Sequence, residues 1–203
     1  MENYIYINGQ KIELTQEQIA QIVAAQEETK VALSEIPEGD TCKIGNYEFV
    51  VLHQNGDTTE IILKDLLPDD ITFGENNYYD GSNPDNVCQE FTQALANVIG
   101  WDNILLHEVD LTSNDGLKDY LSVERRASLL TAEQYRRYVY LLDQYKPDRW
   151  WWLATPDSTA THECESWVLC VSPRGRVNYG LYNLNDFGVR PFCILKSNIF
   201  VSK

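Results

Sequence analysis

RWWWLATP, residues 149–156, places three consecutive tryptophans in a chain that contains only five. Neighbouring side chains of a strand point to opposite faces, so Trp150 and Trp152 are predicted to share one face and Trp151 to lie on the other. Because an indole buries a large apolar area, one or two of these rings are predicted to lie in the core. Pro156 cannot donate to a strand ladder, so the strand is predicted to end there and to open a loop whose position the rings fix.

A second fixed point is predicted at GVRP, residues 188–191. Gly188 is expected to adopt a backbone angle that other residues avoid. Arg190 is a lone charge among apolar residues, so its guanidinium is expected to satisfy buried carbonyl groups or a carboxylate. The alternative is that Arg190 grips an acidic ligand.

The chain from residue 39 onward alternates between strand-like and helix-like patterns. Apolar alternation bounded by turn residues indicates strands, and capped stretches of helical period indicate helices. The predicted elements are two strands within 43–67 joined near Asn55-Gly56, a polar surface loop at 68–86, helices at 87–100 and 131–145, and short strands at 150–156, 166–172, 175–182 and 189–195. This order predicts an α+β fold with two helices and a β-rich C-terminal half.

Residues 1–38 are predicted to form a small N-terminal appendage, a hairpin followed by a helix. The hairpin is expected around Asn8-Gly9, because Asn-Gly is the pair that most readily forms a tight hairpin turn. Thr15 and Gln18 have the spacing of a capping box at the start of the helix. Such a segment is too small to bury a core of its own. We therefore expect it to attach the ligand-binding domain, residues 39–203, to another component, or to bring copies together as a homo-oligomer.

The charge and the cysteine pattern exclude several classes of function. The formal net charge of −15 repels phosphate backbones and anionic lipid, so neither a nucleic-acid partner nor membrane insertion is expected. No apolar stretch approaches the length of a membrane-spanning helix. The five cysteines show no CxxC spacing and no secretory leader precedes them, which predicts free thiols in a reducing compartment. A cytoplasmic or virion location, without a cofactor or a metal, is therefore expected.

The tail motifs together resemble a known family. WWWLATP, SWVLCVSPRGRVNYG and FGVRPFCIL are similar to the signature of the DUF6273-like domain, a small family of unknown function common in phages and Gram-positive gut bacteria. Weaker similarity at IGNYEFVVL, LTSNDG and SLLTAEQYRRY extends the resemblance over about residues 42–197. The family implies a C-type-lectin-like fold, which is also used by variable proteins of diversity-generating retroelements and by formylglycine-generating enzymes.

The resemblance also implies a non-enzymatic recognition protein. In the variable proteins, the segment between the tryptophan run and the closing motif carries the diversified, ligand-contacting side chains. Here that segment contains 157–166 and 176–187, and its interleaved Tyr and Asn suit a binding surface, because Tyr gives rigid contact area and Asn gives adaptable hydrogen bonds. The expected ligand is a protein or glycan on a cell surface. The candidate ligand-binding residues are Asp157, Ser158, Thr161, His162, Glu163, Trp167, Asn178, Tyr179, Tyr182, Asn183, Asn185 and Asp186.

Three alternatives remain at the level of the sequence. His162 and Cys164 could serve an enzyme related to the formylglycine-generating enzymes, although neighbours in an extended loop point apart and the paired cysteines of those enzymes are not matched. Asp80, Asn83 and Asp85 offer oxygen ligands for calcium, but no bidentate Glu follows at the spacing such a loop requires. The third alternative is a structural phage protein whose tail strands only pack.

Overall fold

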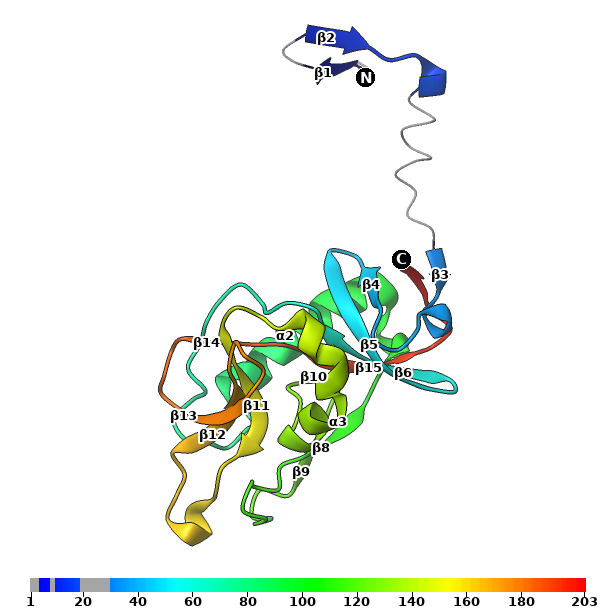
Figure 1. The fold of residues 1–203 in the computed structure, drawn as a ribbon. Coiled ribbons are helices and arrows are strands. Elements are labelled where there is room, and N and C mark those ends of the chain that lie inside the picture. Colours follow the sequence, from blue (N-terminus) through cyan, green and yellow to red (C-terminus); the bar gives the residue numbers. More distant parts are fainter. Residues whose placement is uncertain (1–3, 8–9, 19–29) are drawn as a thin grey trace.

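The computed structural model describes residues 4–7, 10–18 and 30–203, and from residue 30 onward most of the strands belong to two sheets (Figure 1). The larger sheet has the strand order β10-β15-β6-β5-β4-β16-β3, with β7 also paired to β15. Its strand pairs among the described residues are all antiparallel. Its strands are β3 (Lys30–Ala32), β4 (Thr41–Ile44), β5 (Tyr47–Asn55), β6 (Thr58–Leu63), β7 (Ile104–Leu105), β10 (Ala127–Ser128), β15 (Phe192–Lys196) and β16 (Phe200–Ser202).

The smaller sheet contains the tryptophan run and the two strands that follow it, whereas β15 of the C-terminal tail belongs to the larger sheet. The strand order of the smaller sheet is β13-β12-β11-β14, antiparallel except for the parallel pair β11–β14. Its strands are β11 (Trp150–Pro156), β12 (Trp167–Val171), β13 (Val177–Leu181) and β14 (Phe187–Gly188). The four strands predicted for the tail are therefore confirmed as β11, β12, β13 and β15.

Two helices and several short elements complete the described chain. They are α2 (Asn83–Ile99), α3 (Ala132–Leu142), the 3-10 turns η1 (Leu33–Glu35), η2 (Trp101–Asn103), η3 (Asp143–Tyr145) and η4 (Ala160–His162), and the hairpins β1 (Tyr4–Ile7)–β2 (Gln10–Glu13) and β8 (His107–Asp110)–β9 (Ser122–Arg125). The predicted capping box of α3 is present, because the Thr131 side chain accepts from the Gln134 amide and Gln134 accepts from Thr131. Helix α2 begins earlier than predicted, with Ser82 as its N-cap.

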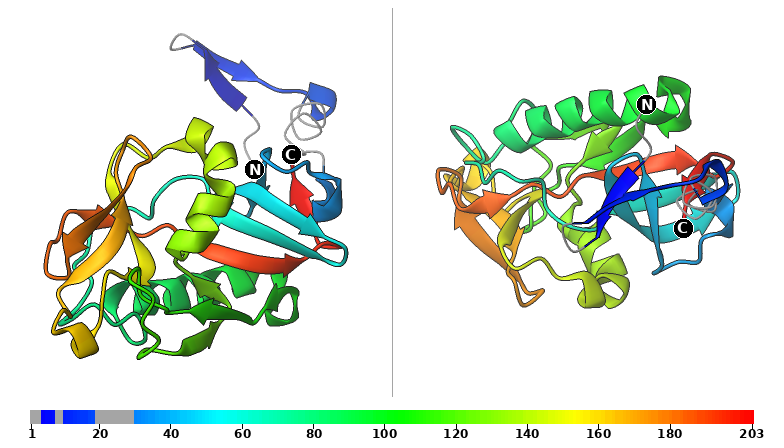
Figure 2. Two further views of the ribbon diagram at one scale, coloured as in Figure 1. Left: turned by 60° about the horizontal axis from the view of Figure 1, so that its bottom comes forward. Right: turned by 90° about the horizontal axis from the view of Figure 1, so that it is seen from above.

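The two helices cover opposite faces of the larger sheet (Figure 2). On β5, Phe49 and Val51 join one cluster together with side chains of α2, whereas Val50 and Leu52 join a second cluster together with side chains of α3. Strand β11 divides between the same two clusters. Trp152 lies in the α2 cluster, with Trp150 packed against that cluster, while Trp151 lies in the α3 cluster. The predicted alternation of the three tryptophans is therefore confirmed, and the chain has the mixed α+β class that was predicted.

The N-terminal prediction is only partly covered by the described residues. The β1–β2 hairpin is present, and Thr15 and Gln18 exchange the two hydrogen bonds of a capping box. Most of the predicted helix lies outside the described residues. Residues 30–36, which were assigned to the appendage, join the main body instead, because β3 pairs with β16 and both Leu33 and Ile36 are fully buried in the α2 cluster.

The segment 68–86 differs from the predicted surface loop. It contains three side chains with no exposed surface, Phe73, Asn77 and Tyr79. The Trp152 indole donates to the carbonyl of Ile71 at 3.0 Å, and the amide of Ile71 donates to the carbonyl of Phe187 at 2.9 Å. The segment therefore forms part of the support for the smaller sheet, although its composition is that of a solvated loop.

Candidate functional site

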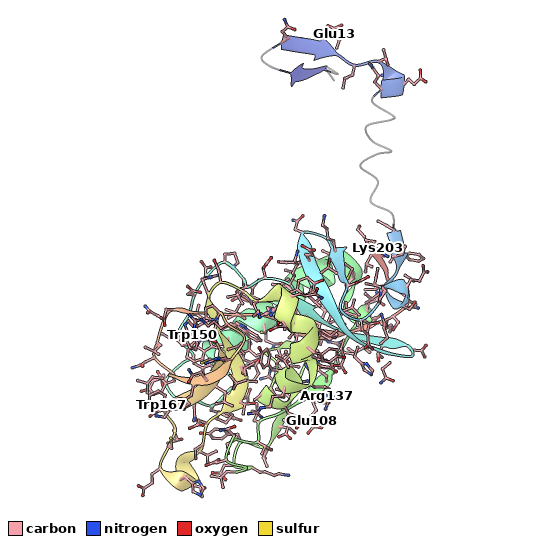
Figure 3. All side chains as sticks on the ribbon, viewed as in Figure 1. Glu13, Glu108, Arg137, Trp150, Trp167 and Lys203 are labelled. Atoms are coloured by element: carbon pink, nitrogen blue, oxygen red, sulfur yellow. The ribbon has the colours of Figure 1, made fainter. Side chains whose placement is uncertain are left out.

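An aromatic pair, Trp167 and Tyr179, lies on strands β12 and β13 of the smaller sheet, and Figure 3 labels Trp167. Trp167 opens β12 and is half-buried, while Tyr179 on β13 is 56% exposed. Their ring centroids lie 5.1 Å apart in an edge-to-face arrangement with an interplanar angle of 82°. An exposed aromatic ring held by a second ring is a ready contact surface, because little side-chain entropy remains to be lost on binding.

Two buried rings hold β13 in place. Trp152 and Phe187 stack with centroids 4.0 Å apart, and Gly180 of β13 lies directly against them. A Cβ at position 180 would come within 2.9 Å of Phe187 and 3.2 Å of Trp152. The absence of a side chain at Gly180 therefore lets the edge strand lie on the stack, and this fixes where the neighbouring Tyr179 emerges.

The segment after β13 is held by its main chain while its side chains face outward. The carbonyl of Tyr182 accepts from the amide of Phe73 at 2.7 Å, and the amide of Tyr182 donates to the carbonyl of Ser166 at 3.0 Å. The Tyr182 ring is half-buried against the α2 cluster. Four exposed side chains follow it: Asn183, Leu184, Asn185 and Asp186. We use the term edge surface for Trp167, Asn178, Tyr179 and residues 183–186.

Asn77 anchors the other predicted loop, residues 157–166. Its buried amide nitrogen donates to the carbonyls of Ser158 at 2.9 Å and Trp167 at 3.0 Å, and its amide oxygen accepts from the Tyr120 hydroxyl at 2.8 Å. The backbone amide of Asn77 also donates to the carbonyl of Glu165 at 3.0 Å. Replacing the Asn77 side chain would be costly, because the carbonyls of Ser158 and Trp167 would be left without a donor where water cannot replace it.

Two carboxylates anchor the tip of the same loop, which projects beyond the smaller sheet at the bottom of Figure 1. Asp115 accepts from the Ser158 hydroxyl at 2.6 Å and contacts Nδ1 of His162 at 2.9 Å. Hydrogen bonds from Ser113, Ser158 and His162 hold the pKa of the Asp115 carboxyl well below its usual range. The hydroxyls of Thr159 and Thr161 lower the pKa of Asp119 in the same way. Both carboxylates therefore stay charged at neutral pH and accept hydrogen bonds from the loop.

The structure divides the predicted binding residues by exposure. Tyr182, Asp157 and Trp167 are half-buried. Ser158 is buried and its hydroxyl donates to Asp115, so it belongs to the anchor of the loop and not to its outward surface. Asp157 accepts from the Asn114 amide at 3.2 Å, so it belongs to the loop anchor as well. The exposed members are Thr161, His162 and Glu163 at η4, and Asn178, Tyr179, Asn183, Asn185 and Asp186 along and after β13.

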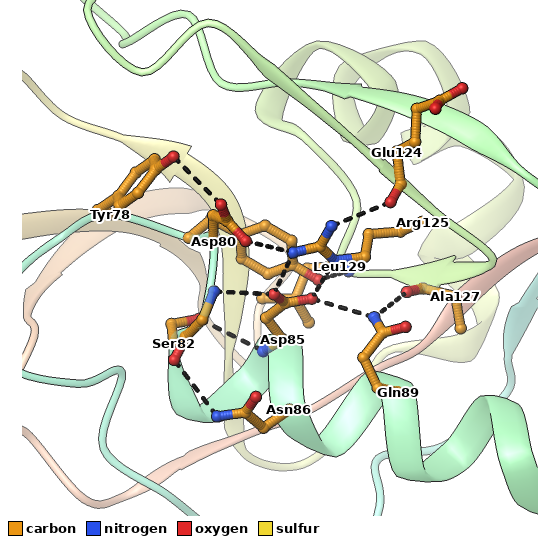
Figure 4. A network of polar contacts seen from close by, with 12 residues as sticks. Tyr78, Asp80, Ser82, Asp85, Asn86, Gln89, Glu124, Arg125, Ala127 and Leu129 are labelled. Atoms are coloured by element: carbon orange, nitrogen blue, oxygen red, sulfur yellow. Dashed lines mark hydrogen bonds and ion pairs between the residues drawn. The ribbon is translucent and has the colours of Figure 1, made fainter.

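The residues of the catalytic and calcium alternatives take part in other interactions in the structure. The His162 ring contacts Asp115, and the amide of Cys164 donates to the carbonyl of Thr159 at 3.1 Å. Asp85 has a 3% exposed side chain that accepts from Arg125 through both carboxylate oxygens, at 2.8 and 2.7 Å, and Asp80 also binds Arg125 (Figure 4). Among the described residues, no group of three or more His, Cys, Asp or Glu side chains is placed to hold a metal ion.

The GVRP motif acts in the core. Arg190 is 1% exposed and donates to the carbonyls of Leu63 at 2.8 Å, Lys64 at 2.6 Å and Tyr145 at 3.0 Å, which confirms the expected role with buried carbonyls. Burial lowers the pKa of Arg190 to about 10, so it remains charged at neutral pH. The expectation for Gly188 is wrong, because it is not among the glycines with positive φ. Its lack of a side chain makes room for Leu66, whose Cδ1 would lie 2.5 Å from a Cβ at that position.

The anchors Asn77, Asp115 and Asp119 were not predicted from the sequence. Asp115 lies in LTSNDG, which was noted only as part of the resemblance, and Asn77 lies in the segment expected to be a surface loop. The partners of these anchors are about 40 to 90 residues away along the chain. No local pattern of a single sequence carries that information, since an anchoring Asn or Asp has the same composition signal as a turn residue.

Comparison with known proteins gives no match: no protein-family model matches the sequence, and neither a curated protein nor a solved structure is significantly similar to the chain. Within the described part of the chain, no helix combines the length and the apolar character needed to cross a membrane. The function is therefore argued from the geometry of the site.

Proposed function

We propose that the protein is a non-enzymatic ligand-binding protein that recognises a protein or glycan on a cell surface through its edge surface. The proposal includes a C-type-lectin-like fold, similar to that of the variable proteins of diversity-generating retroelements. Three features support it: the α+β class, the position of the tryptophan run and the two following strands in one small sheet, and the placement of the polar residues after β13 on the outside of that sheet.

One observation carries the proposal: exposed side chains suited to binding are held by a strand that is fixed from below by buried rings. Tyr179 and the side chains of residues 183–186 face solvent, while the strand beneath them lies on the Trp152–Phe187 stack. Contact residues that are already ordered lose little entropy on binding, which raises affinity for a given contact area. An apolar ring with amides around it also matches the composition of interface hot spots with a polar surround.

Recognition through side chains is favoured over the addition of a strand to the β13 edge. The amide of Tyr179 already donates to the side-chain oxygen of Asn178 at 2.9 Å. The carbonyl of Leu181 accepts from the amide of Leu184 at 3.0 Å. Main-chain groups that are occupied in this way cannot pair with an incoming peptide strand, so the edge is partly protected against that mode of binding.

The N-terminal segment would supply attachment or avidity in this proposal. The β1–β2 hairpin and the capped helix start precede the main body, and linking several copies of one weak binding surface strengthens binding without any new contact. Light scattering on the full chain and on a chain starting at residue 30 tests the avidity role, which expects a larger oligomer only for the full chain. The same number of copies in both would contradict avidity and leave attachment as the role of the segment.

The binding proposal is tested by a screen of glycans and cell-surface proteins with the full chain, Tyr179→Ala and Tyr140→Ala. Tyr140 is the matched control, because it is a tyrosine on α3 that is 69% exposed outside the edge surface. We expect Tyr179→Ala to weaken the strongest hit by about tenfold or more, as removal of an aromatic hot spot does. Tyr140→Ala should bind as the unmodified chain does. Equal binding by all three proteins would refute the proposal and favour a structural role for the tail.

A further inference from the structure

A second concave surface lies away from the edge surface, between α2 and the β9–β10 segment. It is a groove of about 540 Å³, within the size range of small-ligand sites. Its walls include the exposed apolar side chains Trp101 and Leu106, which are 46% and 54% exposed. Groups of this size are costly to leave wet, so a groove that gathers two of them next to polar side chains has the composition of a binding site.

Trp101 is held in place within this groove. The guanidinium of Arg126 lies 5.9 Å from the centroid of the indole ring. Arg126 also donates to the carbonyl of Ile104 and, at 3.4 Å, to the carbonyl of Trp101 itself. Arg126 therefore holds the Trp101 ring in place against the β9–β10 segment. A ring that is already ordered can stack on a ligand without a further loss of entropy.

The charges that line the groove are largely used internally (Figure 4). Arg125 makes a two-pronged ion pair with Asp85 and a further one with Asp80. Asp85 also accepts from the amide of Gly81 at 2.9 Å, so its carboxylate is fully engaged. With Glu124 and Arg126, the lining carries three carboxylates and two guanidinium groups, which nearly cancel. Such a groove selects neither a cation nor, in a chain of net charge −15, an anion.

Two amide side chains on one face of α2 supply unused acceptors. The amide nitrogen of Gln89 donates to Asp85 at 3.1 Å and to the carbonyl of Ala127 at 3.3 Å, and the nitrogen of Asn86 donates to the carbonyl of Gly81 at 3.3 Å. These bonds fix the orientation of both amides, so their oxygens are the free ends. Among the described residues no hydrogen bond to either oxygen is found, and in Figure 4 no dashed line reaches them. A ligand for these positions must bring hydroxyl or amide donors.

We infer that this groove is a second binding site, for a neutral saccharide whose ring stacks on Trp101 and whose hydroxyl groups donate to the amide oxygens of Asn86 and Gln89. A sugar ring combines one apolar face with several hydroxyl donors and no charge. The apolar face suits the indole, the hydroxyl donors suit the free amide oxygens, and the lack of charge suits a lining whose charges are already paired. The inference is independent of the edge surface, because none of its residues belongs to that surface.

The test is calorimetric titration of the full chain with neutral hexasaccharides of glucose, N-acetylglucosamine and mannose, together with polygalacturonate and hexalysine as charged probes. The variants are Trp101→Ala, Trp101→Phe, Tyr140→Ala and Tyr179→Ala, each checked for an unchanged melting curve. Trp101→Phe keeps an aromatic ring in place, so it preserves the fold if Trp101→Ala does not. We expect at least one neutral hexasaccharide to bind, Trp101→Ala to weaken it by about tenfold or more, and Trp101→Phe to weaken it less.

Each other outcome has a defined meaning. Binding that Trp101→Ala and Trp101→Phe leave unchanged overturns the inference, as does the absence of binding by any neutral probe at about 10 mM. Stronger binding of hexalysine or polygalacturonate than of every hexasaccharide also overturns it. Binding lost in Tyr179→Ala but kept in Trp101→Ala would assign the saccharide to the edge surface, which supports the proposed function while refuting this site.

Discussion

Replacing Gly180 with alanine tests the frame beneath the edge surface. The new Cβ would lie 2.9 Å from Phe187 and 3.2 Å from Trp152, closer than carbon atoms normally approach. Neither ring can move away easily, because Trp152 is fully buried and Phe187 is 5% exposed and stacked on it. Overpacking of this kind costs about 1–3 kcal/mol. For a chain of this size each kcal/mol lowers Tm by roughly 2–4 °C, so we expect Gly180→Ala to melt roughly 3–10 °C below the unmodified chain.

Gly74→Ala is the matched control for this prediction. Gly74 has no positive φ, and the nearest atoms to an added Cβ are 4.0 Å away, so the same methyl group should leave Tm nearly unchanged. Thermal denaturation followed by fluorescence gives the Tm of both variants, and urea denaturation gives their free energies of unfolding. The double variant Gly180→Ala with Phe187→Ala then tests the cause: once the ring is removed, the added methyl group should cost much less than in the unmodified chain. Equal Tm values for Gly180→Ala and Gly74→Ala, or strictly additive costs in the double variant, would refute the packing argument.

Three further predictions concern the loop anchor, a buried histidine and the outward side chains. Asn77→Ala should destabilise the fold by about 1–3 kcal/mol and speed proteolysis within 157–166, because the carbonyls that it binds lose their donor; an unchanged cleavage rate would contradict this. Burial lowers the pKa of His107 to about 4, so only the unfolded chain gains that proton between pH 6.5 and 4. Acidification through this window should therefore cost roughly 3 kcal/mol of unfolding free energy in the unmodified chain and not in His107→Gln, as pH-dependent urea melts would show. Alanine at Asn183, Asn185 and Asp186 together should lower Tm by no more than about 6 °C, since three exposed substitutions of about 0.5 kcal/mol or less each amount to about 1.5 kcal/mol at most; a larger loss in thermal melts would show that these side chains support the fold.

Features set by local geometry were predictable from the sequence. The alternation of Trp151 and Trp152 between two clusters follows from the two-residue period of any strand, whatever lies around it. The capping box at Thr131 and Gln134 depends on residues three positions apart, so it too could be predicted. Arg190 was predictable in kind, because a lone charge among apolar residues must find buried acceptors.

Features set by long-range packing were not predictable in the same way. Gly188 was expected to need a special backbone angle, but the structure shows that the side chain of Leu66 requires the space. Ser158 has the composition of a contact residue and lies buried because Asp115, on another loop, accepts its hydroxyl. Residues 30–36 were assigned to the appendage because nothing local shows that β3 pairs with the last strand of the chain. In each case the deciding partner lies far away in the sequence.

The anchoring pattern predicts which outward side chains can be substituted without loss of the fold. Main-chain groups of the two loops are held by Asn77 and by the amide of Phe73. The side chains that take part are those that bind Asp115 or Asp119: Ser158, Thr159, Thr161 and His162. A carbonyl is present whatever the side chain, so substitution of an outward residue leaves these bonds intact. The same logic separates inward Ser158, whose own hydroxyl takes part in the anchor, from outward Glu163 and Asn185. Sequence freedom should therefore follow the direction of each side chain and not the boundaries of the loops.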